Sequence, residues 1–185
     1  MSFPGIPSLD AAVMAFIQTH FHNTVTDTVF PIITSLGEAG IGWIVLSLVL
    51  LCFKKTRRTG GLVLIAMTVT LLFGELTLKN IICRLRPCNV FTDFPMLIAR
   101  PTSYSFPSGH TSSSFAAALI LTLRHKKVGW LAYIPAVLIA FSRLYLYVHF
   151  PSDVLGGAVL GVGIGLLMLY GERQIAGRCK HRPLQ

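Results

Sequence analysis

Five long apolar blocks, separated by short polar stretches, constrain this chain more than any other feature of its sequence. The blocks are residues 40–53, 61–78, 111–123, 128–141 and 154–170. A membrane-spanning helix needs about 20 residues, or about 17 at the lower limit, and each block can be lengthened through mildly polar neighbours. Because unpaired backbone groups are too costly in lipid, these blocks should be helices. We therefore predict an all-α protein, a polytopic membrane bundle with five to six transmembrane helices.

The low content of charged residues excludes an ordinary soluble domain. Only 12% of the residues are charged and 53% are hydrophobic, whereas a soluble domain carries about 25% charge. The chain has 185 residues and contains no internal repeat or linker, so we expect one integral-membrane domain over residues 1–185. The first ten residues lack a basic start and an uninterrupted apolar run, so no cleavable signal peptide is expected.

A sixth helix depends on the N-terminal segment, residues 1–22. Its apolar stretch, residues 9–21, is short and is interrupted by three polar residues, Asp10, Gln18 and His20. The segment is therefore expected either to lie in the membrane interface or to span the membrane as a weak first helix.

Most of the positive charge falls in three clusters. Residues 54–58, residues 124–127 and the tail, residues 171–185, hold four, three and four of the 16 Lys and Arg residues. The clusters follow alternate ends of successive helices, so all three can lie on one side of the membrane, which the positive-inside rule makes the cytoplasm. A nucleic-acid site would need one contiguous basic surface with aromatic residues between its charges, so no nucleic-acid partner is expected.

The other cations lie on the opposite, extracytoplasmic side and break this charge rule. They are Lys79, Arg84, Arg86, Arg100 and Arg143. Several of them fall in residues 79–110, which we expect to form an outer loop. A bound anion would explain why cations gather there.

Three short motifs on this outer side carry residues suited to a phosphate. They are KNIICRLRP (residues 79–87), PSGH (residues 107–110) and SRLYLYVHFPSD (residues 142–153). The three cations Lys79, Arg86 and Arg143 match phosphate oxygens, since Arg offers a planar fork of donors and Lys a compact charge. Ser108 and Gly109 open a helix, where free N–H groups favour an anion, although Ser108 is equally suited to cap that helix. Lys79 is also placed to pair with Glu75 or to extend toward the interface.

Two histidines supply the groups for proton transfer and nucleophilic attack. His149 and Asp153 are four residues apart and share a face if the backbone is helical, whereas Pro151 favours a turn equally well. A carboxylate on one imidazole nitrogen leaves the other nitrogen free to attack. His110 has no acidic neighbour in sequence and is the better candidate to protonate a leaving oxygen.

Together the three motifs resemble the type 2 phosphatidic acid phosphatase superfamily of membrane lipid phosphatases. The resemblance covers residues 79–153 and implies a phosphatase that uses a phosphohistidine intermediate, with no metal and no cofactor. It implies that His149 is the nucleophile, Asp153 its orienting partner and His110 the general acid. The phosphate-binding residues would be Lys79, Arg86, Ser108, Gly109 and Arg143. The outer loop offers only Asp93 as a further acid, which also argues against a magnesium site.

The sequence leaves the substrate open among phosphorylated lipids of the bilayer. A polyprenyl diphosphate such as undecaprenyl diphosphate, hydrolysed outside a bacterial plasma membrane, is the first choice. Phosphatidylglycerol phosphate or phosphatidic acid is the alternative. A vanadate-dependent haloperoxidase shares such an anion pocket but is soluble, and a phosphate or lipid transporter is the non-enzymatic alternative. The oligomeric state is not constrained.

Small and sulfur-containing residues give two further expectations. Gly157, Gly161 and Gly165 form a face for close helix packing, more readily inside one subunit than between two. Cys83 and Cys88 lie near each other on the outer side, but the Arg86–Pro87 turn between them favours free thiols over a disulfide.

Overall fold

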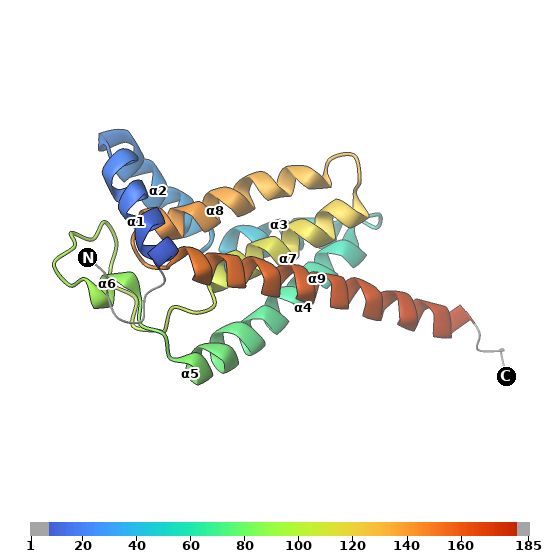
Figure 1. Ribbon diagram of the computed structural model, residues 1–185. Helices are drawn as coiled ribbons and strands as arrows, with labels where there is room; N and C mark the ends of the chain where they lie inside the picture. Colours follow the sequence, from blue (N-terminus) through green and yellow to red (C-terminus); the bar gives the residue numbers. More distant parts are fainter. Residues whose placement is uncertain (1–7, 181–185) are drawn as a thin grey trace.

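The fold was analysed in a computed structural model that describes residues 8–180, and all regular structure within that range is helical (Figure 1). The α-helices are α1 (Ser8–His20), α2 (Thr24–Leu36), α3 (Ile41–Cys52), α4 (Arg57–Thr70), α5 (Lys79–Ile82), α6 (Pro87–Val90), α7 (Gly109–Arg124), α8 (Tyr133–Tyr145) and α9 (Pro151–Lys180). Shorter helical turns are the 3-10 helices η1 (Glu38–Gly40) and η3 (Gly129–Ala132) and the π-helix η2 (Leu71–Leu78). The all-α prediction is confirmed.

Helix α7 forms the centre of the bundle. It packs against α9, α4 and α8, and its buried face consists largely of small residues such as Ala116, Ala117 and Ala118. The glycines of α9 face α7: a Cβ at Gly157 or Gly161 would lie 2.6 or 2.2 Å from a backbone carbonyl oxygen of α7 or its N-cap residue. The prediction that these glycines pack inside the subunit is therefore confirmed.

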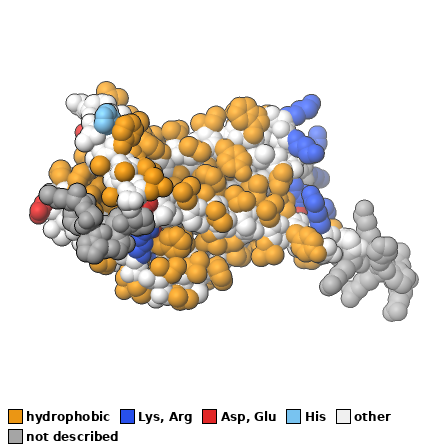
Figure 2. Space-filling view, in the orientation of Figure 1, with side chains coloured by type: hydrophobic (Ala, Val, Ile, Leu, Met, Phe, Trp, Pro, Cys, Tyr) orange, Lys and Arg blue, Asp and Glu red, His pale blue; other side chains and the backbone are white. Residues whose placement is uncertain are grey.

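The surface of the bundle is apolar along the sides of the helices. Val45, Ile65, Leu155 and Val159 all point outward, and Val159 is 74% exposed. A water-soluble protein rarely exposes so much contiguous apolar surface, whereas lipid chains would cover it. Figure 2 shows hydrophobic side chains over the length of the bundle, with some Lys or Arg visible near one end and most gathered at the other. That end carries the α3–α4 and α7–α8 connections, which hold two of the three basic clusters.

The positions of the helices do not by themselves define how many times the chain crosses the membrane. Within residues 8–180, two helical stretches are long and apolar enough to cross a membrane, Arg57–Val90 and Pro151–Gly177. A third span results if Thr24–Leu36 and Glu38–Cys52, which meet at 47°, are counted together. Gly129–Tyr145 is a shorter apolar helix. These findings support an integral membrane protein, and the count of five to six stays a prediction.

Helix α2 was not among the predicted blocks. Its sequence, TVTDTVFPIITSL, contains four Thr residues and Pro31, which lower its hydropathy and obscure the apolar pattern. Asn23 nevertheless defines its start, because the Asn23 side chain accepts the N–H groups of Val25 and Thr26 and the Thr26 hydroxyl pairs with the Asn23 N–H. This capping box stabilises the first turn of a helix that hydropathy alone misses.

The two terminal segments are helical as far as the structure describes them. In α1, Asp10, Met14 and Ile17 face inward against α8 and α9, while Leu9 and Phe16 are exposed. Helix α9 continues through residues 171–180. Residues 1–7 and 181–185 of the predicted N-terminal segment and tail lie outside the described residues, and the membrane position of both segments stays a prediction.

The predicted outer loop, residues 79–110, begins and ends in helices. Lys79 opens α5, which directly continues η2, and Gly109 opens α7. Cys83 and Cys88 both lie in this segment as free thiols, and Cys52 is also free, so the expectation of unpaired cysteines is confirmed for these three side chains.

Candidate active site

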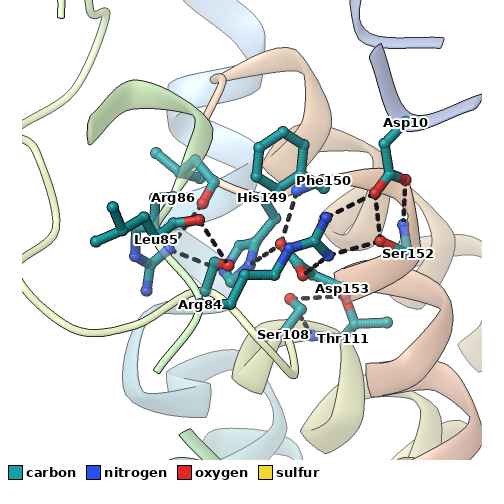
Figure 3. Close-up of polar contacts among 12 residues, drawn as sticks. Asp10, Arg84, Leu85, Arg86, Ser108, Thr111, His149, Phe150, Ser152 and Asp153 are labelled. Atoms are coloured by element: carbon teal, nitrogen blue, oxygen red, sulfur yellow. Dashed lines mark hydrogen bonds and ion pairs between the residues drawn. The ribbon is translucent and has the colours of Figure 1, made fainter. Parts of the chain in front are cut away.

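The three motifs converge at the end of the bundle opposite the α3–α4 and α7–α8 connections (Figure 1). Figure 3 shows residues of all three motifs close together, among them Arg86, Ser108 and His149. The motifs border a cavity of about 540 Å³. Six of the eight predicted site residues line it: Lys79, Arg86, Gly109, His110, Arg143 and His149. Ser108 and Asp153 are fully buried behind its wall. Elements far apart in the sequence thus contribute to one concave, positively charged site.

The three cations predicted to bind phosphate are almost completely buried. Lys79 and Arg86 are each 3% exposed and Arg143 is 4% exposed. Lys79 Nζ pairs with Glu75 Oε1 at 2.6 Å, as the sequence allowed. Buried charges must be paired or hydrogen-bonded, and three cations here face few carboxylates. The cavity therefore favours an anion.

The two arginines are fixed by the backbone and by hydroxyl groups. Arg86 Nε donates to the Ser103 carbonyl oxygen at 2.7 Å, and Arg86 Nη1 donates to the Val148 carbonyl oxygen at 3.0 Å. Arg143 Nη1 donates to the Thr34 hydroxyl. Arg143 Nε is buried without a hydrogen-bond partner among the described residues. Both guanidinium groups are thus positioned in advance, which lowers the cost of ordering them around a ligand.

Hydrogen bonding determines which nitrogen of His149 carries the proton. Arg86 Nη1 lies 3.0 Å from His149 Nε2, and because a guanidinium can only donate, Nε2 must accept. The proton of the neutral ring is then on Nδ1, which faces Asp153 Oδ2 at 3.6 Å. Burial, and then the positive charges of Arg86, Arg143 and Lys79, hold the pKa of His149 well below its usual value. His149 is therefore a neutral imidazole with an unprotonated nitrogen at the cavity wall.

The two residues of the His149–Asp153 pair lie on either side of the start of α9, His149 in the loop before it and Asp153 in its first helical turn. Helix α9 begins at Pro151, so His149 lies before it, and the turn is the correct one of the two alternatives left open by the sequence. Asp153 Oδ2 accepts the Phe150 N–H at 2.8 Å. This contact caps α9 and fixes the rotamer of Asp153, so the same oxygen that faces His149 is held by the helix start.

The PSGH motif forms the start of α7. The Ser108 side chain accepts the Thr111 N–H and hydroxyl, so it caps the helix. Gly109 lies against Glu75: a Cβ at Gly109 would be 2.5 Å from Glu75 Oε2. His110 Nε2 lies 3.6 Å from Glu38 Oε2. His110 thus has an acidic neighbour in space, although it has none in sequence.

Comparison with known proteins identifies the family. Residues 59–175 match the PAP2 superfamily. This chain belongs to the PAP2 superfamily. All three motifs of the site lie within the matched residues.

Relatives of this PAP2 protein include enzymes that act on lipid phosphates. An undecaprenyl-diphosphatase of Sulfolobus acidocaldarius is 39% identical over 126 residues, covering 68% of this chain and 61% of that protein. The crystal structure of the PAP2-type phosphatidylglycerolphosphate phosphatase of Bacillus subtilis matches with a TM-score of 0.72 and 31% identity, covering 91% of this chain and 86% of the other. The crystal structure of Aquifex aeolicus LpxE matches with a TM-score of 0.77 and 26% identity, covering 92% and 99%.

Several residues that contact the PAP2 motifs were not predicted. They are Asp10, Thr34, Glu38, Arg84 as an ion-pair residue, and Ser103. Their partners lie between 17 and 142 positions away, from the Arg86–Ser103 contact to the Asp10–Ser152 contact, so local spacing gives no signal. The polar character of Asp10 within an apolar helix was a signal, but it was interpreted as an interruption.

Arg84, one of the five outer cations, has carboxylate partners in place of a bound anion. Its guanidinium does not line the cavity but pairs with Asp153 and Asp10, at 2.6 and 2.8 Å. Arg100 lines the cavity rim and donates to the carbonyl oxygens of Cys88 and Thr92. Ion pairing and loop bracing therefore account for part of the positive charge at this end.

Proposed function

We propose that this PAP2 protein is a membrane lipid phosphatase that hydrolyses a lipid-linked phosphate or diphosphate through a phosphohistidine intermediate. The observation that carries the proposal is the neutral His149, whose unprotonated Nε2 lies at the wall of a cavity with three buried cations. A nucleophile and an anion pocket at one place are what phosphoryl transfer requires.

The first step forms a bond between His149 Nε2 and phosphorus and breaks the phosphorus–oxygen bond to the leaving group. Burial and the nearby cations lower the pKa of His110. The negative charge of the bound phosphate offsets these cations, so that protonated His110 gives its proton to the departing oxygen. Asp153 stabilises the positive charge that develops on the His149 ring. For a diphosphate the leaving group is the lipid monophosphate, and for a monophosphate it is the lipid alcohol.

The second step hydrolyses the intermediate. His110, now neutral, takes a proton from water, and the resulting hydroxide attacks phosphorus as the phosphorus–nitrogen bond breaks. Inorganic phosphate leaves, and both histidines return to their starting states. Lys79, Arg86 and Arg143 stabilise the oxygens of the transferred group, each contact contributing on the order of 4 kcal/mol at about 4 Å and an effective dielectric near 20, before desolvation.

A second cavity supports a lipid substrate. It has a volume of about 430 Å³. It shares four lining residues with the 540 Å³ cavity of the site, which we call the phosphate cavity: Glu38, Glu75, Gly109 and His110. Its other walls include apolar side chains of α3, α4 and η2: Ile44, Leu64, Met67 and Leu71. An apolar space beside a phosphate site suits the first carbons of a lipid chain.

Polyprenyl diphosphate, such as undecaprenyl diphosphate, is the first substrate we propose, in line with the name of the archaeal relative. Phosphatidylglycerol phosphate or phosphatidic acid is the alternative, and the Bacillus structural neighbour favours the first of these two. We further propose that the basic end of the bundle is cytoplasmic and that the site faces the outside of the plasma membrane.

Phosphate release from purified protein in detergent tests the proposal. The protein should release phosphate from undecaprenyl diphosphate, phosphatidylglycerol phosphate or phosphatidic acid in the presence of EDTA, and the ratio of rates ranks the substrates. His149→Ala should abolish release, whereas His20→Ala, on the exposed end of α1, should not change it. Release that EDTA abolishes, or that survives His149→Ala, would contradict the mechanism. Absence of release with all three lipids would favour a transporter.

A further inference from the structure

Arg84 does not line the phosphate cavity, and its guanidinium contacts Asp153, Ser152 and Asp10 (Figure 3). Its Nη1 donates to Asp153 Oδ1 and to Ser152 Oγ, each at 2.6 Å, and its Nη2 donates to Asp10 Oδ2 at 2.8 Å. The guanidinium also lies 4.4 Å from the centre of the Phe150 ring. One side chain thus bridges two carboxylates and covers the residue that precedes α9.

Asp10 connects this bridge to α1. It is 3% exposed, its Oδ1 accepts the Ser152 N–H at 2.9 Å, and its Oδ2 accepts the Ser152 hydroxyl. The Ser152 N–H belongs to the first turn of α9, where backbone donors have no partner within the helix. Asp10 therefore caps α9 from another helix and, at the same time, holds Arg84 in place.

The bridge formed by Arg84 affects the ionisation of Asp153, and through it the charge that the His149 ring can carry in the proposed reaction. Asp153 has no exposed surface, and a buried carboxylate is strongly destabilised unless it is paired and hydrogen-bonded. Arg84 supplies the opposite charge at Oδ1, while Oδ2 accepts the Phe150 N–H and lies 3.6 Å from His149 Nδ1. On the cavity side, His149 faces the cations Lys79, Arg86 and Arg143. The carboxylates Glu38 and Glu75 and the titratable His110 line the same cavity. Because cations outnumber carboxylates there, an ionised Asp153 favours positive charge on the ring.

We propose that Arg84 and Asp10 are positioning residues: Arg84 keeps Asp153 ionised and aimed at His149 Nδ1, and Asp10 of α1 keeps Arg84 in that position. This inference rests on the proposed function, since it assigns Asp153 the orienting role in phosphoryl transfer. It also gives α1 a place in the active site, although no residue of α1 lines the phosphate cavity.

Steady-state kinetics on Arg84→Gln provides the test. We expect kcat to fall by about 10- to 100-fold, as is usual when a group that orients a reacting side chain is removed. KM should change by less than about threefold, because a group outside the cavity does not bind the substrate directly. The acid limb of the kcat profile should move to higher pH, since loss of the guanidinium favours protonated Asp153. Arg84→Lys, which keeps the charge, should recover part of kcat, and Asp10→Asn should show a smaller effect in the same directions.

Arg124→Gln is the matched control, because it removes a different arginine–carboxylate pair, with Glu172, at the opposite end of the bundle. It should leave kcat, KM and the pH profile unchanged. A raised KM with unchanged kcat in Arg84→Gln would mean that Arg84 binds substrate and would overturn the inference. A lower rate with an unchanged pH profile, matched by a lower folded fraction, would mean a purely structural role and would overturn it as well.

A measurement without turnover separates this inference from the proposed function. In the NMR spectrum of ¹⁵N-histidine-labelled protein, the chemical shift of the proton on His149 Nδ1 should change in Arg84→Gln and Asp10→Asn but not in Arg124→Gln. An unchanged His149 signal in Arg84→Gln would refute the positioning role of Arg84 even in a protein that hydrolyses lipid phosphates. If wild-type protein releases no phosphate, the proposed function fails, and this spectrum still decides whether Arg84 and Asp10 position Asp153 against His149.

Discussion

A methyl group at Gly161 tests the contact that holds the two helices of the site together. A Cβ there would lie 2.2 Å from the Ser112 carbonyl oxygen, whereas real Cβ atoms essentially never approach another atom closer than 3.0 Å. Because Ser112 contributes a backbone atom of α7, no side chain can rotate away to make room. Helices α7 and α9 must therefore separate by at least about 0.8 Å, the difference between these two distances.

Gly163 is a matched control on the same helix, since a Cβ there meets nothing within 4 Å. Both Gly→Ala changes gain the same intrinsic helix preference, about 1 kcal/mol, so this term cancels between them. The remaining difference is the cost of overpacking, about 1–3 kcal/mol. At about 2–4 °C per kcal/mol for a chain of this size, Gly161→Ala should melt several degrees below Gly163→Ala.

Activity should follow the same order. Helix α7 carries His110 and α9 carries Asp153, so separating the helices displaces His110 from Asp153, two residues of the proposed mechanism. A displacement of about 1 Å can cost on the order of 100-fold in rate. Thermal unfolding in detergent and phosphate release measure the two effects. Equal melting temperatures for Gly161→Ala and Gly163→Ala would show that the α7–α9 contact is not as close as described, and the reasoning would fail.

Three further predictions concern the phosphate cavity. Arg143→Lys keeps the charge but loses the fork of donors, so KM should rise by about tenfold, equivalent to one charge-assisted hydrogen bond of roughly 1.5 kcal/mol; an unchanged KM would contradict this. The pKa of His149 lies well below its usual value because of burial and neighbouring cations, so the neutral form that attacks is kept as pH falls. Arg86→Gln removes one of these cations and should therefore raise the pKa of His149. The acid limb of the pH profile of kcat/KM, measured on the same substrate as for wild type, should then move to higher pH. A shift to lower pH would refute the assignment of this limb to His149. Glu38→Gln should lower kcat by less than about threefold, because Glu38 is 70% exposed and its pair with His110 is screened by water; a larger loss of phosphate release would give Glu38 a direct catalytic role.

The sequence was informative about the site because each motif places its residues at a helix end. Six of the eight residues selected from the three motifs line one cavity, and the long apolar blocks correspond to α3, α4 with η2, α7, α8 and α9. Helix α2 was missed because Thr residues and Pro31 dilute its apolar character. Its start was nevertheless encoded locally, in the capping box at Asn23.

Long-range pairs were beyond sequence reasoning for a physical reason. Arg84 and Asp10 are 74 positions apart, and nothing in the local pattern of either segment indicates that the two side chains meet. The positions of the basic clusters place Arg84 at the end with the phosphate motifs, but nothing in that pattern indicates its two carboxylate partners. A carboxylate buried in an apolar helix, as Asp10 is in α1, requires a cationic or hydrogen-bonding partner, and this requirement was the available signal.

The tripeptide Arg84–Leu85–Arg86 explains why the first motif contacts both ends of the His149–Asp153 pair. Arg86 donates to His149 Nε2, and Arg84 donates to Asp153 Oδ1. The tripeptide is held by the segment before α7: the Ser105 N–H donates to the Arg84 carbonyl oxygen at 2.8 Å, and the Ser105 hydroxyl donates to the Leu85 carbonyl oxygen at 3.2 Å. Since Leu85 is 56% exposed, its side chain turns away from the site while its backbone is fixed. Two arginines separated by one residue therefore contact opposite ends of the pair, one at His149 Nε2 and the other at the carboxylate of Asp153.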